Sequence, residues 1–92
     1  MEHKENNVVY IGKKSPVDYA TVILSRFNQG QSPVILRARG NVISNLVDSQ
    51  QILVNRFLPG TKVESVKLST EQLQGEDGKN RNVSVMEVTL TR

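Results

Sequence analysis

Apolar residues recur along this chain with two different periods, and the switches between them predict six elements. A β-branched and aromatic run at residues 8–11, closed by Gly12, indicates a first strand. Ser15, Pro16 and Asp18 then carry the signals of a helix start, and the helix ends near residues 28–30. Its predicted buried stripe has helical spacing and consists of Val17, Ala20, Leu24 and Phe27.

A second strand and a second helix follow. Strand alternation over residues 34–40 separates a predicted core face, Val34, Leu36 and Ala38, from an opposite face, Ile35, Arg37 and Arg39. The helix is predicted from about residue 41 to residue 57, and Pro59-Gly60 stops it. Its predicted stripe consists of Ile43, Leu46, Val47, Gln50, Leu53 and Phe57.

Two long strand-like runs, residues 62–73 and 80–91, end the chain. The Asp77-Gly78 pair between them is a strong hairpin signal. In the last run, apolar residues occupy both odd and even positions, which face opposite sides of a strand. Val83 and Val85 are at odd positions, and Met86, Val88 and Leu90 are at even positions. This pattern indicates either a bulge or a strand partly covered on both faces.

The order β-α-β-α-β-β predicts an α/β (α+β) fold with a long C-terminal β-hairpin. We expect one two-layer domain over residues 7–92, preceded by a frayed tail at residues 1–6. A chain of 92 residues buries too little surface to be more than marginally stable alone, and it would gain from dimerising.

Composition disfavours most enzyme classes. The chain has no cysteine and a single histidine, His3, so it lacks a thiolate nucleophile, a disulfide framework and the ligands of a common zinc site. We therefore expect no enzymatic activity, no metal and no cofactor. No apolar run approaches a membrane span and residues 1–10 lack the apolar core of a signal peptide, so we expect a cytoplasmic location and no membrane partner.

The formal charge of +3 is unevenly distributed. No acidic residue lies between Asp18 and Asp48, whereas three arginines do: Arg26, Arg37 and Arg39. This asymmetry suggests a polyanionic partner, although an ordinary solvated basic face remains an equal alternative.

The basic residues gather at two strand-to-helix junctions. Lys13 and Lys14 directly precede a helix N-terminus, whose free N–H groups and dipole attract phosphate. Arg37 and Arg39 precede the second helix, and adjacent strands would combine all four basic groups in one cluster. Asn41 beside them is either a ligand or the helix cap.

Other residues are ambiguous from sequence alone. Tyr19 either faces the core or donates a hydrogen bond to phosphate, and Phe57 is either core or a subunit contact. The hairpin tip carries Lys79 and Arg81 and could enter a nucleic-acid groove, or it could be an ordinary hairpin. The carboxylates Glu76 and Asp77 at this tip are best explained as turn chemistry.

Four sequence blocks resemble the Alba family of small archaeal chromatin proteins: residues 7–14, Asn28-Gln29-Gly30, Arg37-Ala38-Arg39-Gly40 and residues 55–59. The resemblance implies a homodimer that binds double-stranded DNA and RNA without sequence preference and coats, bridges or compacts it. It also implies that Lys13 is the acetylated lysine, Lys14 its basic neighbour, Arg39 a backbone-contacting arginine and Phe57 a dimer–dimer contact. Arg37 stands where the family often has lysine.

Three positions depart from the family pattern and lower the positive potential of the implied site. Asn41 stands where some members have arginine, Asn45 where they have lysine, and Asp18 where asparagine is common.

The sequence therefore predicts a dimeric, non-catalytic, chromosome-associated nucleic-acid-binding protein. Its predicted contact residues are Lys13, Lys14, Tyr19, Arg37, Arg39, Asn41, Asn45, Lys79 and Arg81. Alternatives are an accessory protein of RNA processing, a paralogue that heterodimerises with another Alba protein, and a module whose basic face meets an acidic protein. A nuclease is disfavoured.

Overall fold

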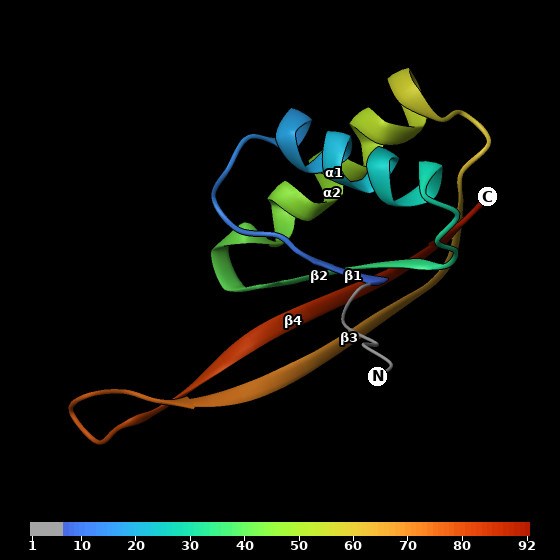
Figure 1. Cartoon of the computed structure of the whole chain (residues 1–92). Coiled ribbons are helices and arrows are strands. Elements are labelled where there is room, and N and C mark those ends of the chain that lie inside the picture. The colour runs from blue at the N-terminus through green and yellow to red at the C-terminus, as the bar shows by residue number, and fades with distance from the viewer. Residues whose placement is uncertain (1–6) are drawn as a thin grey trace.

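In the computed structural model, a four-stranded sheet is covered on one face by two helices, as predicted (Figure 1). The structure describes residues 7–92. The predicted tail at residues 1–6 and His3 lie outside the described residues. The elements are β1 (Val8–Tyr10), α1 (Pro16–Asn28), β2 (Val34–Arg39), α2 (Ile43–Ile52), β3 (Lys62–Gln74) and β4 (Asn80–Thr91). Neither described helix is long and apolar enough to cross a membrane.

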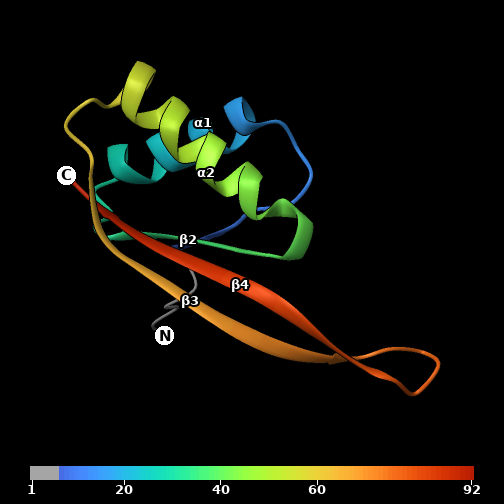
Figure 2. The ribbon, with the colours of Figure 1, turned by 180° about the vertical axis from the view of Figure 1, so that it is seen from behind.

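The sheet has the strand order β1-β2-β4-β3. Strands β1 and β2 are parallel, with Tyr10 opposite Arg37, so their carboxyl ends lie at the same edge of the sheet. The pairing of β2 with β4 ends at Arg39 and Val85, whereas β3 and β4 stay paired as far as Gln74 and Asn80. The end of the hairpin therefore projects beyond the sheet as a two-stranded arm (Figures 1 and 2).

The mixed parity of the last strand reflects burial on both faces. Val88 and Leu90 are buried on the helix side, and Val85, of opposite parity, is only 1% exposed. The sheet does contain a register shift, but it lies in β3 between Val63 and Ser65. Of the two alternatives for this run, coverage on both faces is confirmed.

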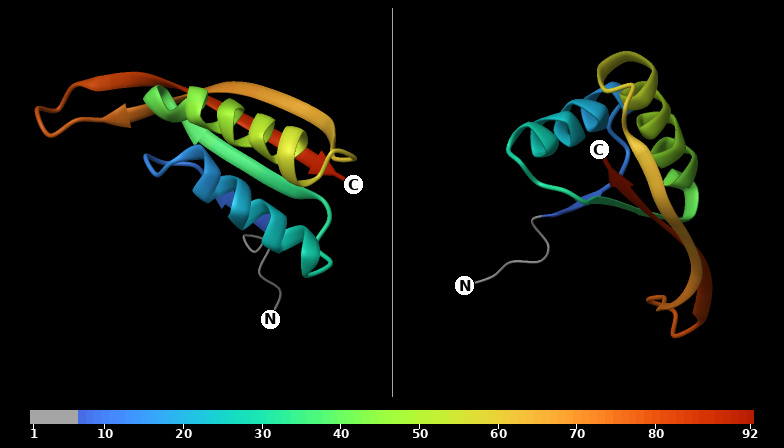
Figure 3. Two further views of the ribbon diagram at one scale, coloured as in Figure 1. Left: turned by 90° about the horizontal axis from the view of Figure 1, so that it is seen from above. Right: turned by 90° about the vertical axis from the view of Figure 1, so that its right-hand side faces the viewer.

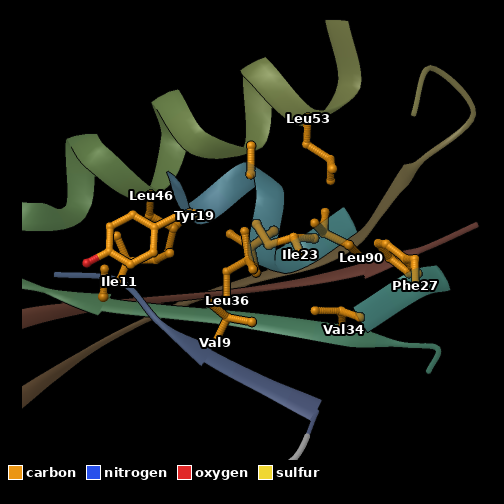
Figure 4. Packing of buried hydrophobic residues seen from close by; sticks show 13 residues of the cluster. Val9, Ile11, Tyr19, Ile23, Phe27, Val34, Leu36, Leu46, Leu53 and Leu90 are labelled. Carbon is orange, nitrogen blue, oxygen red and sulfur yellow. The ribbon is translucent and has the colours of Figure 1, made fainter. Parts of the chain in front are cut away.

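The core lies between the helices and the sheet, where α1 and α2 pack side by side (Figures 3 and 4). The predicted core face of β2 is confirmed, because Val34, Leu36 and Ala38 are all buried.

The predicted stripe of α1 is partly wrong. Tyr19 and Ile23 are buried with Ala20 and Phe27, whereas Val17 is 42% exposed and Leu24 is half-buried. Because α1 packs against both the sheet and α2, its buried arc is rotated away from the side that simple periodicity selected.

The second helical region is not one continuous α-helix. A 3₁₀ turn at Gly40–Val42 precedes α2, and a π-helical turn at Leu53–Phe57 follows it. The interpretation of Asn41 as helix cap is wrong, since Arg39 occupies the cap position of the 3₁₀ turn and Asn41 lies inside it. In the predicted stripe, Leu46, Gln50 and Leu53 are buried, but Val47 is 41% exposed and Ser49 is fully buried instead.

Candidate nucleic-acid interface

Lys13 and Lys14 are exposed in the loop between β1 and α1. The loop runs directly into the N-terminus of α1, where the Asp18 N–H donates a 3.3 Å hydrogen bond to the Ser15 hydroxyl and Pro16 occupies the first turn. The first N–H groups of the helix and both ammonium groups therefore belong to one short segment. Together they favour an anion at this place.

Tyr19 of α1 and Asn45 of α2 both form hydrogen bonds with the backbone of this loop. We call these four hydrogen bonds the loop clamp. The Tyr19 hydroxyl accepts from the Gly12 N–H at 2.7 Å and from the Lys14 N–H at 3.3 Å. The Asn45 side-chain amide donates to the Gly12 and Lys14 carbonyl oxygens, both at 2.8 Å. Both peptide units beside Lys13 are thereby tied to the two helices.

The core-facing alternative for Tyr19 is confirmed, whereas Asn45 has backbone partners that the sequence did not suggest. The ring of Tyr19 is buried, and its hydroxyl points out of the core cluster (Figure 4). The side-chain amide of Asn45 donates to backbone carbonyls of the loop. The backbone carbonyl of Asn45 accepts from the buried Ser49 hydroxyl at 2.7 Å. Direct contact of Tyr19 or Asn45 with nucleic acid stays a prediction. Sequence reasoning missed Ser49, whose only signal was a small polar residue next to the predicted stripe.

Arg37 and Arg39 lie on the sheet face turned away from the helices, which we call the open face. Arg37 forms ion pairs with Glu71 and, at 3.2 Å, with Glu87, while Arg39 pairs with Glu71 at 3.1 Å. Strand β2 adjoins β4, so Arg37 and Glu87 are direct cross-strand partners, and Glu71 reaches them from β3. Two carboxylates therefore balance the two guanidinium groups.

The predicted cluster of four basic groups is only partly assembled. The two junctions do share one edge of the sheet, as expected. The arginines, however, lie on the open face with acidic partners, whereas the lysines lie in a loop held by the helices. Sequence reasoning missed Glu71 and Glu87. The hairpin turn indicates which residues of β3 and β4 face each other, but it cannot give the register of β4 against β2.

Asn41 and Arg81 line one open depression of about 500 Å³ between the 3₁₀ turn and the root of the arm. Lys79 and Arg81 are both exposed in the arm. The turn chemistry predicted for Asp77 is confirmed, because its carboxylate accepts from the Lys79 N–H at 3.0 Å. Gly78 has φ +80°, a conformation that favours glycine.

Phe57 ends the π-helical turn, half-buried and packed against the core cluster. Its contact with a second dimer stays a prediction. Within residues 7–92, no group of three or more histidine, aspartate or glutamate side chains is placed to hold a metal ion.

Comparison with known proteins gives consistent matches. A family model described as Alba matches residues 7–70. The DNA/RNA-binding protein Alba of Thermoplasma acidophilum is 42% identical over 88 residues, which cover 96% of this chain and 98% of that protein. The DNA/RNA-binding protein Alba of Methanococcus maripaludis is 40% identical over 86 residues, covering 92% and 97% of the two chains. The solved structure of Alba from Thermoplasma volcanium superimposes with a TM-score of 0.86 at 40% identity, covering 92% of this chain and 99% of the other.

Proposed function

Because the chain belongs to the Alba family, we propose that it is a chromatin protein that binds double-stranded DNA and RNA without sequence preference. The relatives carry the name DNA/RNA-binding protein, and this chain aligns with them over nearly its whole length. In this proposal the protein has no catalytic role, coats, bridges or compacts nucleic acid, and resides with the chromosome.

The observation that carries the proposal is the pair of exposed lysines held at the N-terminus of α1. Phosphates that approach this place meet two ammonium groups and the positive end of the helix dipole. Binding then releases the counterions condensed on the nucleic acid, which makes the affinity strongly dependent on salt. Contacts to phosphate carry no sequence information, so the same surface serves DNA and RNA.

The arm and the 3₁₀ turn extend this surface. Asn41 and Arg81 share one depression, and Lys79 lies further along the arm. We assign these side chains to contacts with the same nucleic acid beside the lysines. Arg39, with a side chain 57% exposed, contributes in competition with its ion pair to Glu71.

An apolar surface between α2 and β3 supports dimerisation with a second copy of the chain. The side chains of β3 that form it, Val63, Val66 and Leu68, are 48%, 54% and 70% exposed. Val47 of α2 is 41% exposed. A groove of about 140 Å³ between these elements is lined almost entirely by apolar side chains. Strand β3 is also an edge strand, whose unpaired backbone groups favour a partner. A heterodimer with a paralogue would use the same surface.

Lys13 is the proposed site of acetylation. Its side chain is exposed, and its ammonium group adjoins a helix N-terminus. Acetylation would remove the charge and leave the clamp intact, because the clamp uses the backbone of Gly12 and Lys14.

A salt titration tests the proposal. With Arg39 held by Glu71, Lys13, Lys14 and one basic side chain of the arm from each subunit make about six phosphate contacts per dimer, which gives a slope of log K against log salt near −5 on a random-sequence duplex. The Lys13→Ala/Lys14→Ala variant should lose about one unit of slope per lysine and subunit. Arg26→Ala/Arg92→Ala, which removes the same charge from the last turn of α1 and from the residue after β4, outside the proposed dimer surface, is the matched control. Equal losses in both variants, or no loss in the first, would refute the lysine site.

RNA as the dominant partner is the second candidate, because the names of the relatives give RNA beside DNA. Competition between the random duplex and a structured RNA of equal length separates the two. Displacement of the duplex at equal concentrations supports a shared surface. Displacement by a hundredfold less RNA would make RNA the principal ligand.

A further inference from the structure

We propose that Tyr19 and Asn45 are positioning residues, which act on nucleic-acid binding by holding the loop that carries Lys13 and Lys14. The inference rests on the proposed function of these lysines and assigns the two clamp residues no contact with nucleic acid. The sequence suggested that Tyr19 and Asn45 contact nucleic acid directly, whereas this inference gives both residues an indirect role.

The clamp encloses the point from which Lys13 extends. Gly12 and Lys14 each give one N–H to the Tyr19 hydroxyl, and each accepts from the Asn45 amide. Lys13 lies between these two tied residues, and its side chain is exposed. The loop is therefore fixed through its backbone, which leaves the lysine side chains free for a ligand.

The surrounding residues fit this role. A Cβ atom added at Gly12 would lie 3.0 Å from the Tyr19 hydroxyl, so glycine permits the close approach that the clamp needs. Asn45 is itself held, since the Ser49 hydroxyl donates to its backbone carbonyl at 2.7 Å and Ser49 is fully buried. The clamp is thus built onto the packed part of the molecule.

The clamp joins both helices to the loop. Tyr19 comes from α1 and Asn45 from α2, 31 residues beyond Lys14 in the chain. A loop already held in place loses less conformational freedom when it binds phosphate than a free loop does. Loss of the clamp should therefore weaken binding roughly 3- to 10-fold, through the lysines alone.

A double-mutant cycle tests this route. Asn45→Ala is measured in the wild-type chain and in Lys13→Ala/Lys14→Ala, at low salt on the same duplex, with Asn28→Ala as the control at the far end of α1. We expect a roughly 3- to 10-fold loss in the first background and less than a twofold loss in the second. Equal losses in both backgrounds would mean that Asn45 acts directly or through the fold, and would overturn the inference.

Tyr19→Phe is the second variant, because it keeps the buried ring and removes the acceptor. It should give the same dependence on background, and the Gly12 and Lys14 amides should exchange their hydrogens faster. Unchanged exchange, or unchanged affinity in the wild-type background, would overturn the inference while the lysine site stands. If Lys13→Ala/Lys14→Ala binds like the wild type, the proposed function itself fails, and the inference fails with it.

Discussion

Substitution of Glu71 by glutamine should destabilise the fold and, in the same protein, strengthen nucleic-acid binding. Glu71 accepts from Arg37 and from Arg39 on the open face. Arg37 keeps its second partner, Glu87, at 3.2 Å in the variant. Arg39 loses the carboxylate that it contacts among the described residues and becomes available to phosphate.

The two effects have comparable magnitudes. The paired side chains are 32%, 34% and 57% exposed, and ion pairs in such settings contribute roughly 0.2–1 kcal/mol each. Loss of two pairs therefore costs about 1 kcal/mol of unfolding free energy, or about 4–8 °C in Tm for a domain of this size. One released arginine per subunit should steepen the salt slope by about 0.9 for each subunit. A gain of about 1 kcal/mol per dimer corresponds to roughly fivefold tighter binding.

The assay combines a thermal melt with a salt titration on the random-sequence duplex. Asp48→Asn on the exposed side of α2 is the matched control, because it changes the net charge equally without touching Arg37, Arg39 or the arm. Glu71→Gln must bind more tightly than this control and must melt at a lower temperature. Affinity no higher than that of Asp48→Asn would refute competition between Glu71 and phosphate, and an unchanged Tm would refute the contribution of the ion pairs to stability.

Three further predictions follow from other parts of the molecule. Lys13→Gln, as a mimic of acetylation, should flatten the salt slope by about one unit per subunit at unchanged Tm, and a full slope would contradict the proposed contact. Val66→Asp, at an exposed side chain of the apolar surface between α2 and β3, should convert dimers into folded monomers in a sedimentation experiment. The control Val22→Asp, at a side chain of α1 that is 40% exposed, should leave the dimer intact. Dimers that persist in Val66→Asp would exclude this surface. Leu36→Ala, at a fully buried position of β2, should cost about 2–5 kcal/mol in denaturant unfolding, and a loss below 1 kcal/mol would contradict its place in the core.

Much of the fold and one part of the candidate site followed from local chemistry. Alternation in β2 selects the side chains that are buried, and the Asp-Gly pair identifies the hairpin turn. The capping residues before α1 place Lys13 and Lys14 at a helix N-terminus. These features depend on neighbours a few residues away in the chain, so the sequence by itself determined them.

The surroundings of the site were decided by tertiary structure. Glu71 meets Arg39 across 32 residues, and Asn45 meets Gly12 across 33, through contacts that no local pattern encodes. The rotation of α1, which buries Tyr19 and exposes Val17, likewise depends on packing against α2 and the sheet. Strand register and helix rotation minimise the free energy of the whole core. They therefore decide which charges are balanced, which loop is held, and which lysines remain free to bind.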